Sequence, residues 1–464
     1  MPELNFDFVK NALRAEVRGK LSEKAFSKVS TDTRDLPQGS LFVALKGENF
    51  DAHDFVADAL KKGAAACVVR KGFELPDNPD ACLFQVPDTL FALGELATAW
   101  RSRFSLPVAA VTGSNGKTTS KEMLASILSS RSEVLKNKGN FNNLIGLPLT
   151  LLGLSPLHKI CVVEMGMNAP GEIKRLTQIA VPDVGVITNV GAAHLGPMGS
   201  LEAVAKAKAE LFEGLGDHAR AVVNIDDPLL APWAEKMADR AITFGMSEKA
   251  QVSCRDISAL GTRQAFNLVL PEGVLERVRL AAPGSHNVKN ALAAAATAWA
   301  MGFSAEEIKK GLEGFAPVRG RLHYQKSMWG YAVVDDTYNA NPSSLQGGLE
   351  ALGPIASGRP KGLILGDMLE LGPDAPRLHE KAGRMAVEAG CNLVMALGGF
   401  APQVAKGAQE AGLSPDMALA FDDFMELVEA SFEVLTGEEV VLIKGSRAMR
   451  MERVVKALVS GEIS

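Results

Sequence analysis

Short apolar runs alternate with amphipathic segments along most of the chain, which is the pattern of parallel strands joined by helices. The run at 106–111 predicts a buried strand, and the apolar residues of 123–128 fall on one face of a following helix. Related runs predict strands at 41–45, 65–69, 159–163, 184–188, 221–225, 241–244, 331–334, 362–365, 393–397 and 440–443. Helices are predicted at 55–60, 87–105, 171–179, 201–215 and, rich in alanine, 291–298. The fold class is therefore α/β.

The length of 464 residues exceeds the usual size of one domain. The pattern predicts a small α/β domain at 1–86, a central domain with a doubly wound parallel sheet at 87–317, and a Rossmann-like domain at 318–464. Residues 250–280 of the central domain have a β-like pattern. The third domain lacks a Gly-x-Gly-x-x-Gly motif, so NAD is not expected to bind there.

The charge balance and hydropathy exclude two kinds of partner. Lys and Arg number 49 against 54 Asp and Glu, which gives a net charge of −5 and no electrostatic case for nucleic acid or an anionic membrane. No apolar run reaches the roughly 18 residues of a membrane span, so a membrane-embedded protein is not expected. The first residues lack the basic and apolar segments of a secretory signal.

The cysteines are scattered and form no Cys-x-x-Cys motif, so we expect buried free thiols and a reducing, cytoplasmic location. They are Cys67, Cys82, Cys161, Cys254 and Cys391.

A phosphate-binding loop follows the strand at 106–111. Glycines let the backbone approach a phosphate, and a helix N-terminus presents N–H groups and a positive dipole end to it. Lys117 can reach the β- and γ-phosphates of a nucleotide, and Thr118 can bind Mg²⁺. The usual motif is G-x-x-x-x-G-K-[ST], and Val111 stands where its first glycine would be. The predicted loop residues are Gly113, Ser114, Asn115, Gly116, Lys117, Thr118 and Thr119.

Three further residues of the central domain could hold metal ions. Glu164 ends a predicted strand, where a carboxylate can anchor Mg²⁺, although a helix-capping role is the alternative. His194 offers a neutral nitrogen ligand, but a lone histidine is often structural. Lys208 lies on the next helix, where the pattern alone indicates a solvated lysine. The sequence supplies no Ser-His-Asp set or zinc cluster, so the chemistry must come from ATP and positioned charge.

Polar clusters also occur in the other two domains. Those at 30–34 and 46–54 are explained by turn chemistry, with a helix cap at Asp51 or Asp54. In the third domain, polar loops follow three of the predicted strands, at 335–342, 366–372 and 444–447.

The order of these motifs resembles the Mur ligase family, and the resemblance covers nearly the whole chain. The series is Gly113-x-x-Gly-Lys-Thr-Thr, Glu164-Met-Gly-Met, Thr188-Asn-Val-Gly-x-x-His194, Ala207-Lys208-x-x-Leu-Phe, Asn224-x-Asp-Asp-Pro, Gly284-x-His-Asn-x-x-Asn290, Arg319-Gly-Arg321 and Asp336-x-Tyr-Asn-Ala-Asn-Pro. Further motifs are similar to the family member that adds D-alanyl-D-alanine to UDP-N-acetylmuramoyl-tripeptide. They are Asp32-Thr-Arg, Lys46-Gly-x-x-x-Asp-Ala-His53, Asp335-Asp-Thr-Tyr-Asn-Ala-Asn-Pro and Lys444-Gly-Ser-Arg.

The resemblance implies one domain each for the UDP-sugar-peptide, for ATP and for the incoming dipeptide. For the uridine and diphosphate it implies Ser30, Asp32, Arg34, Lys46 and His53. For the nucleotide it adds Asn287, Asn290, Arg321 and Asp336. For the dipeptide it implies Tyr338, Asn339, Asn341, Lys444 and Arg447. For two Mg²⁺ ions it implies Thr118, Glu164, His194 and a carbamylated Lys208. The catalytic group would comprise Lys117, Lys208, His194 and Asp336.

The implied reaction is amide ligation in peptidoglycan precursor synthesis. The tripeptide carboxylate would attack the γ-phosphate, and the amine of D-alanyl-D-alanine would then attack the acyl phosphate, after the third domain has closed over the second. A cytoplasmic monomer is expected. Folylpolyglutamate synthase and the enzyme that adds the third residue are alternatives of the same fold, and the loop Tyr338-Asn-Ala-Asn-Pro argues against both. A P-loop switch is a further alternative, but Asn137-Lys138-Gly139-Asn140 does not supply the Asn-Lys-x-Asp guanine motif.

Overall fold

The computed structural model describes residues 3–20, 25–47, 49–75, 78, 80–191, 198–271 and 273–462. The chain forms two compact units. The first consists of Met1–Thr112, Arg131–Gly185 and Glu210–Ala219, and the second of Gly113–Ser130, Val186–Ala209 and Arg220–Ser464. Within the described ranges, no helix combines the length and the apolar character needed to cross a membrane.

An N-terminal sheet in the first unit has the strand order β1-β5-β4-β3-β2, with β1 antiparallel and the other strands parallel. Its strands are β1 (Glu16–Arg18), β2 (Val29–Ser30), β3 (Ser40–Val43), β4 (Ala64–Arg70) and β5 (Leu83–Val86). Successive side chains of a strand point to opposite faces. Leu41 and Val43 therefore pack with α1 (Phe6–Leu13) and α3 (Thr89–Arg101), whereas Phe42 packs with α2 (Val56–Lys61), which follows the short helix η1 (Ala52–Phe55).

The middle sheet has the order β11-β10-β9-β6-β8-β7, and its pairs β6–β8, β7–β8 and β10–β11 are parallel. Its strands are β6 (Val108–Thr112), β7 (Val134–Lys136), β8 (Ile160–Glu164), β9 (Val184–Ile187), β10 (Arg220–Asn224) and β11 (Ala241–Phe244). Its helices include α4 (Lys117–Leu128), α5 (Gly146–Leu151), α6 (Glu172–Ala180), α8 (Leu201–Glu213) and α9 (Pro232–Met237). The order of strands reverses at β6, which confirms the predicted doubly wound sheet. Ligands of such sheets bind at that reversal.

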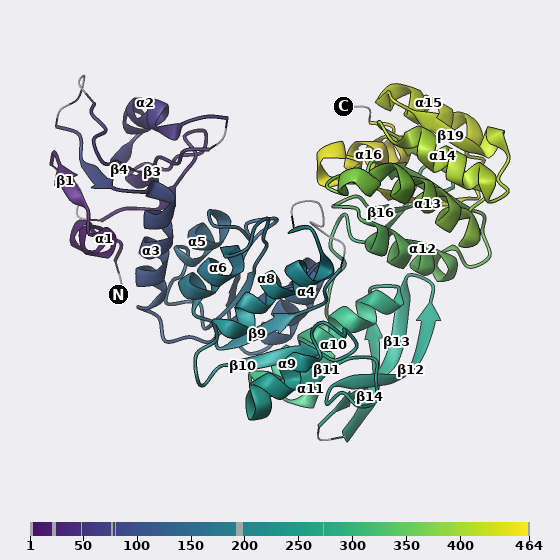
Figure 1. Cartoon of the computed structure of the whole chain (residues 1–464), viewed down its shortest axis with the longest axis horizontal. Helices are drawn as coiled ribbons and strands as arrows, with labels where there is room; N and C mark the ends of the chain where they lie inside the picture. The colour runs from purple at the N-terminus through teal and green to yellow at the C-terminus, as the bar shows by residue number, and fades with distance from the viewer. Residues whose placement is uncertain are drawn as a thin grey trace. The chain divides into compact units, whose positions relative to one another are not determined.

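The alanine-rich segment forms α10 (Ser285–Ala300), which packs against α4, β10 and β11. Its small side chains permit the close packing that the sequence predicted. The next helix, α11 (Ala305–Glu313), begins with a capping box between Ser304 and Glu307. Beside α11, the segment with the β-like pattern forms an antiparallel sheet of β12 (Ser253–Leu260), β13 (Arg263–Leu270) and β14 (Gly273–Leu280) (Figure 1).

The C-terminal sheet has the order β15-β16-β20-β17-β18-β19, and β15 is antiparallel to β16. Its strands are β15 (His323–Lys326), β16 (Ala332–Asp336), β17 (Lys361–Gly366), β18 (Leu393–Leu397), β19 (Ala418–Phe421) and β20 (Val440–Lys444). One face packs with α12 (Pro342–Ala356), α13 (Ala375–Glu388) and α14 (Ala401–Glu410). The other face packs with α15 (Phe424–Val434) and α16 (Glu452–Ser460) (Figure 1).

The predicted strands and helices are confirmed, with small shifts at their ends. The sequence analysis gave no bounds for the remaining elements, which include most of the strands at sheet edges, where side chains are less completely buried. They are α1, β1, β2, β5, β7, α5, α9, α11, β15, α12, α13, α14, β19, α15 and α16.

The cysteines are free and buried, as the sequence predicted. Burial raises the pKa of the thiols of Cys67 and Cys161 to about 12, so these groups are protonated and unreactive near neutral pH. Cys67 lies on β4 and Cys82 directly precedes the neighbouring strand β5, but their side chains belong to the cores on opposite faces of the sheet. Their orientation therefore does not suit a disulfide bond.

Close packing of α13 on α14 depends on glycine. A Cβ atom at Gly407 would lie 1.8 Å from the carbonyl oxygen of Glu380. We expect Gly407→Ala to lower the free energy of unfolding by about 1–3 kcal/mol, because the helices must move apart. Gly353→Ala in α12 is the matched control, since its Cβ would meet no atom within 4 Å and alanine favours a helix by about 0.5–1 kcal/mol. Chemical denaturation compares the two variants, and equal stability would contradict the packing argument.

Candidate active site

The loop between β6 and α4 requires glycine at two positions. Gly113 has a φ of +147° and Gly116 a φ of +80°, values that residues with a side chain rarely adopt. A Cβ atom at Gly113 would lie 1.9 Å from Oγ1 of Thr188, and one at Gly116 would lie 2.0 Å from Oδ1 of Asn290. The backbone therefore runs in contact with the end of β9 and with α10, both part of the same compact unit.

The start of α4 suits an anion. Gly116 precedes the helix and provides no side-chain cap, so the first backbone N–H groups need another acceptor. Nζ of Lys117 donates to the carbonyl oxygens of Gly113 at 2.8 Å and Ser114 at 3.2 Å, which folds the lysine over the loop. Backbone N–H groups, the helix dipole and an ammonium group thus gather at one place, as phosphate groups require.

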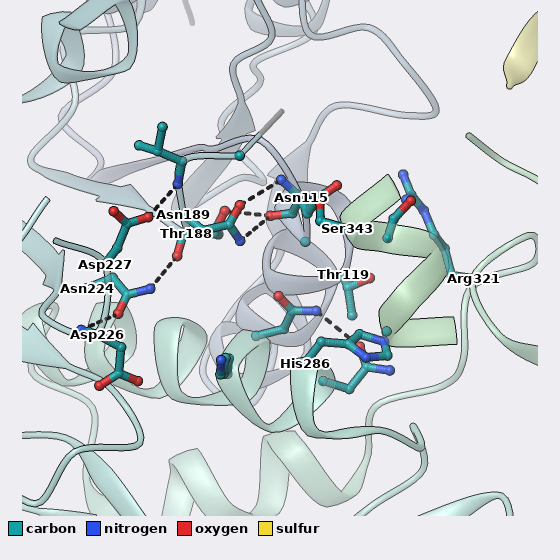
Figure 2. Close-up of a pocket in the computed structure, with 18 of the residues that line it drawn as sticks. Asn115, Thr119, Thr188, Asn189, Asn224, Asp226, Asp227, His286, Arg321 and Ser343 are labelled. Carbon is teal, nitrogen blue, oxygen red and sulfur yellow. Dashed lines mark hydrogen bonds between the residues drawn. The ribbon is translucent and has the colours of Figure 1, made fainter. Parts of the chain in front are cut away.

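Side chains that follow β9 and β10 hold the loop in place. Oγ1 of Thr188 donates to the carbonyl oxygen of Asn115 at 2.6 Å, and the backbone N–H of Asn115 donates to Oδ1 of Asn189 at 2.9 Å. Asn224 supports this arrangement, because its Nδ2 donates to the carbonyl oxygen of Thr188 at 2.8 Å. In addition, the N–H of Val190 donates to the carboxylate of Asp227 at 2.7 Å (Figure 2).

The side chain of Asn115 reaches the first turn of α12. Its Nδ2 donates to Oγ of Ser343 at 2.9 Å, and its Oδ1 accepts from Nδ2 of Asn341 at 2.9 Å. Asn341 also caps α12, because its Oδ1 accepts from the N–H of Ser344. Figure 2 shows Asn115 between Asn189 and Ser343. The phosphate loop and the polar loop after β16 therefore share a hydrogen-bond network.

A cavity of about 470 Å³ lies beside this network. It brings together most of the residues that the sequence analysis assigned to the nucleotide. Those lining it are Asn115, Gly116, Thr119, Asn287, Asn290, Arg321 and Asp336.

Residues at the start of α10 form one wall of the cavity. Nδ2 of Asn290 donates to Oδ1 of Asn287 at 3.1 Å, and Nδ2 of Asn287 donates to the carbonyl oxygen of Pro283 at 2.7 Å. His286 lies beside them, and its buried Nδ1 has no hydrogen-bond partner among the described residues. Burial lowers the pKa of His286, so its ring is neutral and offers one nitrogen to a polar ligand.

Arg321 also lines the cavity. Its Nη2 donates to Oγ1 of Thr118 at 3.4 Å, and its guanidinium lies 4.1 Å from the centre of the Tyr338 ring. The ring orients the guanidinium by a cation–π contact. Its Nε is buried without a partner among the described residues, which leaves a donor for a ligand.

Asp336 and Lys444 form a buried ion pair between paired residues of β16 and β20. Nζ of Lys444 also donates to the carbonyl oxygen of Asn339 at 3.0 Å, and Oδ1 of Asp336 accepts from the N–H of Leu322 at 3.3 Å. Burial lowers the pKa of Lys444, and the Asp336 carboxylate opposes that shift. In the structure, Lys444 thus holds the loop after β16.

Arg447 was assigned to the dipeptide with Lys444, but its surroundings differ. Its side chain is exposed and pairs with Glu452 at 3.0 Å. It is absent from the described residues that line the cavity.

The predicted metal ligands fall into three groups. Lys208 is buried in α8, and desolvation, followed by repulsion from Lys117, lowers its pKa well below the usual value. Glu164 is buried at the end of β8 in the first compact unit, whereas Thr118 and Lys208 belong to the second. His194 lies outside the described residues. Within the described ranges, no group of His, Cys, Asp and Glu side chains has the arrangement of a metal site.

The residues assigned to uridine and diphosphate lie in two turns of the first unit. In one, the Asp32 carboxylate accepts hydrogen bonds from Arg34, which hold the pKa of Asp32 at about 2, and Oγ of Ser30 accepts from the N–H of Asp32 at 3.2 Å. In the other, Lys46 is exposed, and Nε2 of His53 accepts from the N–H of Arg70 at 2.9 Å.

Asp51 caps η1, as the turn interpretation of this cluster predicted. The Nδ1 proton of His53 is donated to Asp51 at 2.5 Å. Both ring nitrogens of His53 are hydrogen-bonded within the protein, so His53 orders its turn. Of the two residues that this turn contributes to the predicted uridine and diphosphate site, Lys46 is therefore the one whose side chain is more available to a ligand.

Sequence reasoning assigned no role in the site to His286, Ser343, Asn189 and Asp227, although Asn189 and Asp227 follow predicted strands at their ligand-binding ends. The signal was present, since most of these residues belong to motifs that the sequence analysis quoted. The motifs alone do not show which residues lie next to each side chain in space.

Comparison with known proteins agrees with this arrangement. Family models match residues 25–101 (Mur ligase family, catalytic domain), 111–298 (Mur ligase middle domain) and 320–447 (Mur ligase, glutamate ligase domain). The UDP-N-acetylmuramoyl-tripeptide–D-alanyl-D-alanine ligase of Bacillus subtilis (strain 168) is 35% identical over 453 residues, which cover 97% of each chain. The chain belongs to the Mur ligase family.

Solved structures of this family superpose closely. MurF from Acinetobacter baumannii has a TM-score of 0.91 at 33% identity, covering 99% of both chains. The MurF ligase from Thermotoga maritima in complex with ADP has a TM-score of 0.80 at 30% identity, covering 93% of this chain and 96% of that one. The predicted three-domain α/β fold is therefore the Mur ligase fold.

The buried ion pair of this Mur ligase can be tested by denaturation. We expect Lys444→Met to lower the free energy of unfolding by about 3–5 kcal/mol, because the Asp336 carboxylate loses its cation. The exposed Lys406, which pairs with Glu380 at 3.1 Å, is the control, and Lys406→Met should cost less than about 1 kcal/mol. Adding Asp336→Asn to Lys444→Met should recover much of the loss. A Lys444→Met protein as stable as the control would refute the role of the pair.

Proposed function

We propose that this Mur ligase joins D-alanyl-D-alanine to UDP-N-acetylmuramoyl-tripeptide with hydrolysis of ATP to ADP and phosphate, in peptidoglycan precursor synthesis. The observation that carries the proposal is the near full-length relationship, at 35% identity, to the UDP-N-acetylmuramoyl-tripeptide–D-alanyl-D-alanine ligase of Bacillus subtilis (strain 168). The loop Tyr338-Asn-Ala-Asn-Pro supports it against the sister ligases of the same fold. The reaction would take place in the cytoplasm. The three domains would comprise residues 1–86, 87–317 and 318–464.

ATP would occupy the cavity with its phosphates at the start of α4. The uncapped helix, the two glycines and Lys117 support the placement of the phosphates. Asn287 and Asn290 would face the adenine, while Arg321 and Asp336 would face the sugar and phosphates. The unpaired Nε of Arg321 and Nδ1 of His286 support a polar ligand in this position.

The chemistry of two of the predicted ligands fits Mg²⁺. The Thr118 hydroxyl and the Glu164 carboxylate are hard oxygen donors, which Mg²⁺ prefers. Thr118 and Glu164 would hold one ion and His194 with Lys208 a second. When bound, the ions would offset the charge of the phosphates and of the attacking carboxylate.

Lys208 would serve the second ion only after carbamylation. Burial and repulsion from Lys117 lower the pKa of its amine well below the usual value, which favours the neutral form, whose nitrogen lone pair can attack CO₂. The new N–C bond and the loss of one amine proton give a carbamate anion. This chemistry converts a neutral amine into a carboxylate-like ligand.

The proposed ligation has two steps. An oxygen of the tripeptide carboxylate attacks the γ-phosphorus, the bond to ADP breaks, and an acyl phosphate forms. Lys117 offsets the repulsion between the two anions. The amine of D-alanyl-D-alanine then attacks the acyl carbon, phosphate leaves, and the amine loses a proton.

The substrates on either side of ATP would be held by the other predicted residues. Ser30, Asp32, Arg34 and Lys46 would contact uridine and diphosphate, with His53 ordering their surroundings through Asp51. Tyr338, Asn339 and Asn341 would lie near the dipeptide, where Lys444 fixes their loop. The exposed guanidinium of Arg447 would meet the dipeptide carboxylate.

The substrate requirement is tested by phosphate release from Mg-ATP. We expect release only when both UDP-N-acetylmuramoyl-tripeptide and D-alanyl-D-alanine are present, because the acyl phosphate needs one and its resolution needs the other. Release driven by a single free amino acid would assign a sister ligase. Hydrolysis of ATP without either substrate would contradict the ligase mechanism itself.

The carbamate is tested by chemical rescue. Lys208→Ala should lower the ligase rate by at least about 100-fold, in the range of a lost metal ligand or its support, and added short carboxylic acids should restore much of it. Lys206→Ala, an exposed lysine on the same helix, should retain the wild-type rate. Failure of acetate or formate to restore any activity would count against the carbamate.

A further inference from the structure

The segment between β7 and α5 contains four asparagines, Asn137, Asn140, Asn142 and Asn143, and the sequence analysis dismissed part of it as a guanine-binding motif. Two of these asparagines contact Glu164 within the first compact unit.

Asn137 fixes the backbone at Glu164. The N–H of Glu164 donates to Oδ1 of Asn137 at 2.9 Å, and Nδ2 of Asn137 donates to the carbonyl oxygen of Glu164 at 2.9 Å. The last paired residues of β7 and β8 are Lys136 and Val162, so the asparagine amide extends the contact to the end of β8. Its Nδ2 also donates to the carbonyl oxygen of Phe141 at 2.9 Å, which closes the segment on itself.

Asn142 contacts the carboxylate of the same residue. Its Nδ2 donates to Oε1 of Glu164 at 2.8 Å. Its own backbone is held, because the N–H of Gly166 donates to its carbonyl oxygen at 2.8 Å. A Cβ atom at Gly166 would lie 2.9 Å from Oδ1 of Asn142, so glycine at this position leaves room for the amide.

We propose that Asn142 is a positioning residue that orients the Glu164 carboxylate for Mg²⁺. This inference rests on the proposed function, in which Glu164 is a metal ligand. A hydrogen bond to one carboxylate oxygen fixes the rotation of the group, and the two bonds from Asn137 fix the backbone that carries it. Because the Glu164 carboxylate is already oriented in the free protein, ion binding would cost less rotational entropy.

The chemistry of the amide suits this purpose. It is a neutral donor, so it orients the carboxylate without cancelling the negative charge that attracts the cation. A lysine or arginine here would compete with the ion, and an aspartate would repel Glu164. Partners that orient a metal ligand typically contribute 10–100-fold to metal affinity.

Metal binding tests the proposal without turnover. Mn²⁺ is titrated into the whole protein with saturating ADP, and free Mn²⁺ is measured by electron paramagnetic resonance. Asn142→Ala should raise the Kd for Mn²⁺ about 10-fold, and Glu164→Ala should raise it at least as much. The double variant should match Glu164→Ala, because Asn142 acts through that carboxylate.

Asn143→Ala is the matched control. Oδ1 of Asn143 accepts from the N–H groups of Ile145 and Gly146, so this side chain orders the start of α5. This variant should lower the thermal unfolding midpoint and leave the Kd for Mn²⁺ unchanged. If it weakens Mn²⁺ binding as much as Asn142→Ala does, the effect is general loosening of the segment, and the proposal fails.

Kinetics provide a second measurement. Asn142→Ala should raise the Mg²⁺ concentration for half-maximal ligase rate about 10-fold, with the maximal rate recovered at saturating Mg²⁺. A wild-type Kd for Mn²⁺ in Asn142→Ala, or further weakening in the double variant, would overturn the proposal. If the wild-type protein releases phosphate without either substrate, while Asn142→Ala still weakens Mn²⁺ binding relative to wild type, the ligase assignment alone is overturned.

Discussion

The fit between the phosphate loop and its neighbours is the constraint on which the site depends. Gly113 lies against Thr188 and Gly116 lies against Asn290, with no space for a Cβ atom at either position. The loop therefore touches the end of β9 and the start of α10 at once. The polar residues after β9 satisfy backbone groups of the loop, since Thr188 and Asn189 both bond to Asn115. At the start of α10, Asn290 instead accepts from the hydroxyl of Ser120 in α4 at 3.4 Å.

Buried charge provides the corresponding constraint in the C-terminal sheet. The desolvation of Lys444 and Asp336 offsets much of their attraction, so the pair contributes little to stability relative to apolar residues. What it supplies is geometry. Because Lys444 also binds the carbonyl oxygen of Asn339, the ion pair determines where the polypeptide leaves β16. From there the chain leads to Asn341, which contacts the phosphate loop through Asn115.

The sequence was sufficient for the fold where burial alone determines structure. Apolar runs such as 106–111 and 393–397 became central strands, because both faces of these strands are covered. The edge strand β15, with partly exposed side chains throughout, has no such pattern. The motif order identified the family, and local chemistry identified the cap at Asp51.

The partners of individual side chains could not be predicted in the same way. The family resemblance implied that His53 and Lys444 bind substrate, but in the structure each bonds to a group that the fold brings from elsewhere in the chain. Asn142 was overlooked for the same reason, since its partner Glu164 lies on another strand. Spacing describes neighbours on one element, whereas these contacts depend on how elements pack.

Lys208 shows how resemblance and physical chemistry combine. The helical pattern favoured a solvated lysine, and only the family resemblance suggested another role. Its burial now gives that role a physical basis, because desolvation favours the neutral amine. The proximity of Lys117 acts in the same direction, since two ammonium groups repel each other. Once an anionic carbamate replaces the amine, the same Lys117 attracts it. The arrangement therefore disfavours a positive charge at residue 208, and attraction to Lys117 would offset part of the desolvation cost of a negative one.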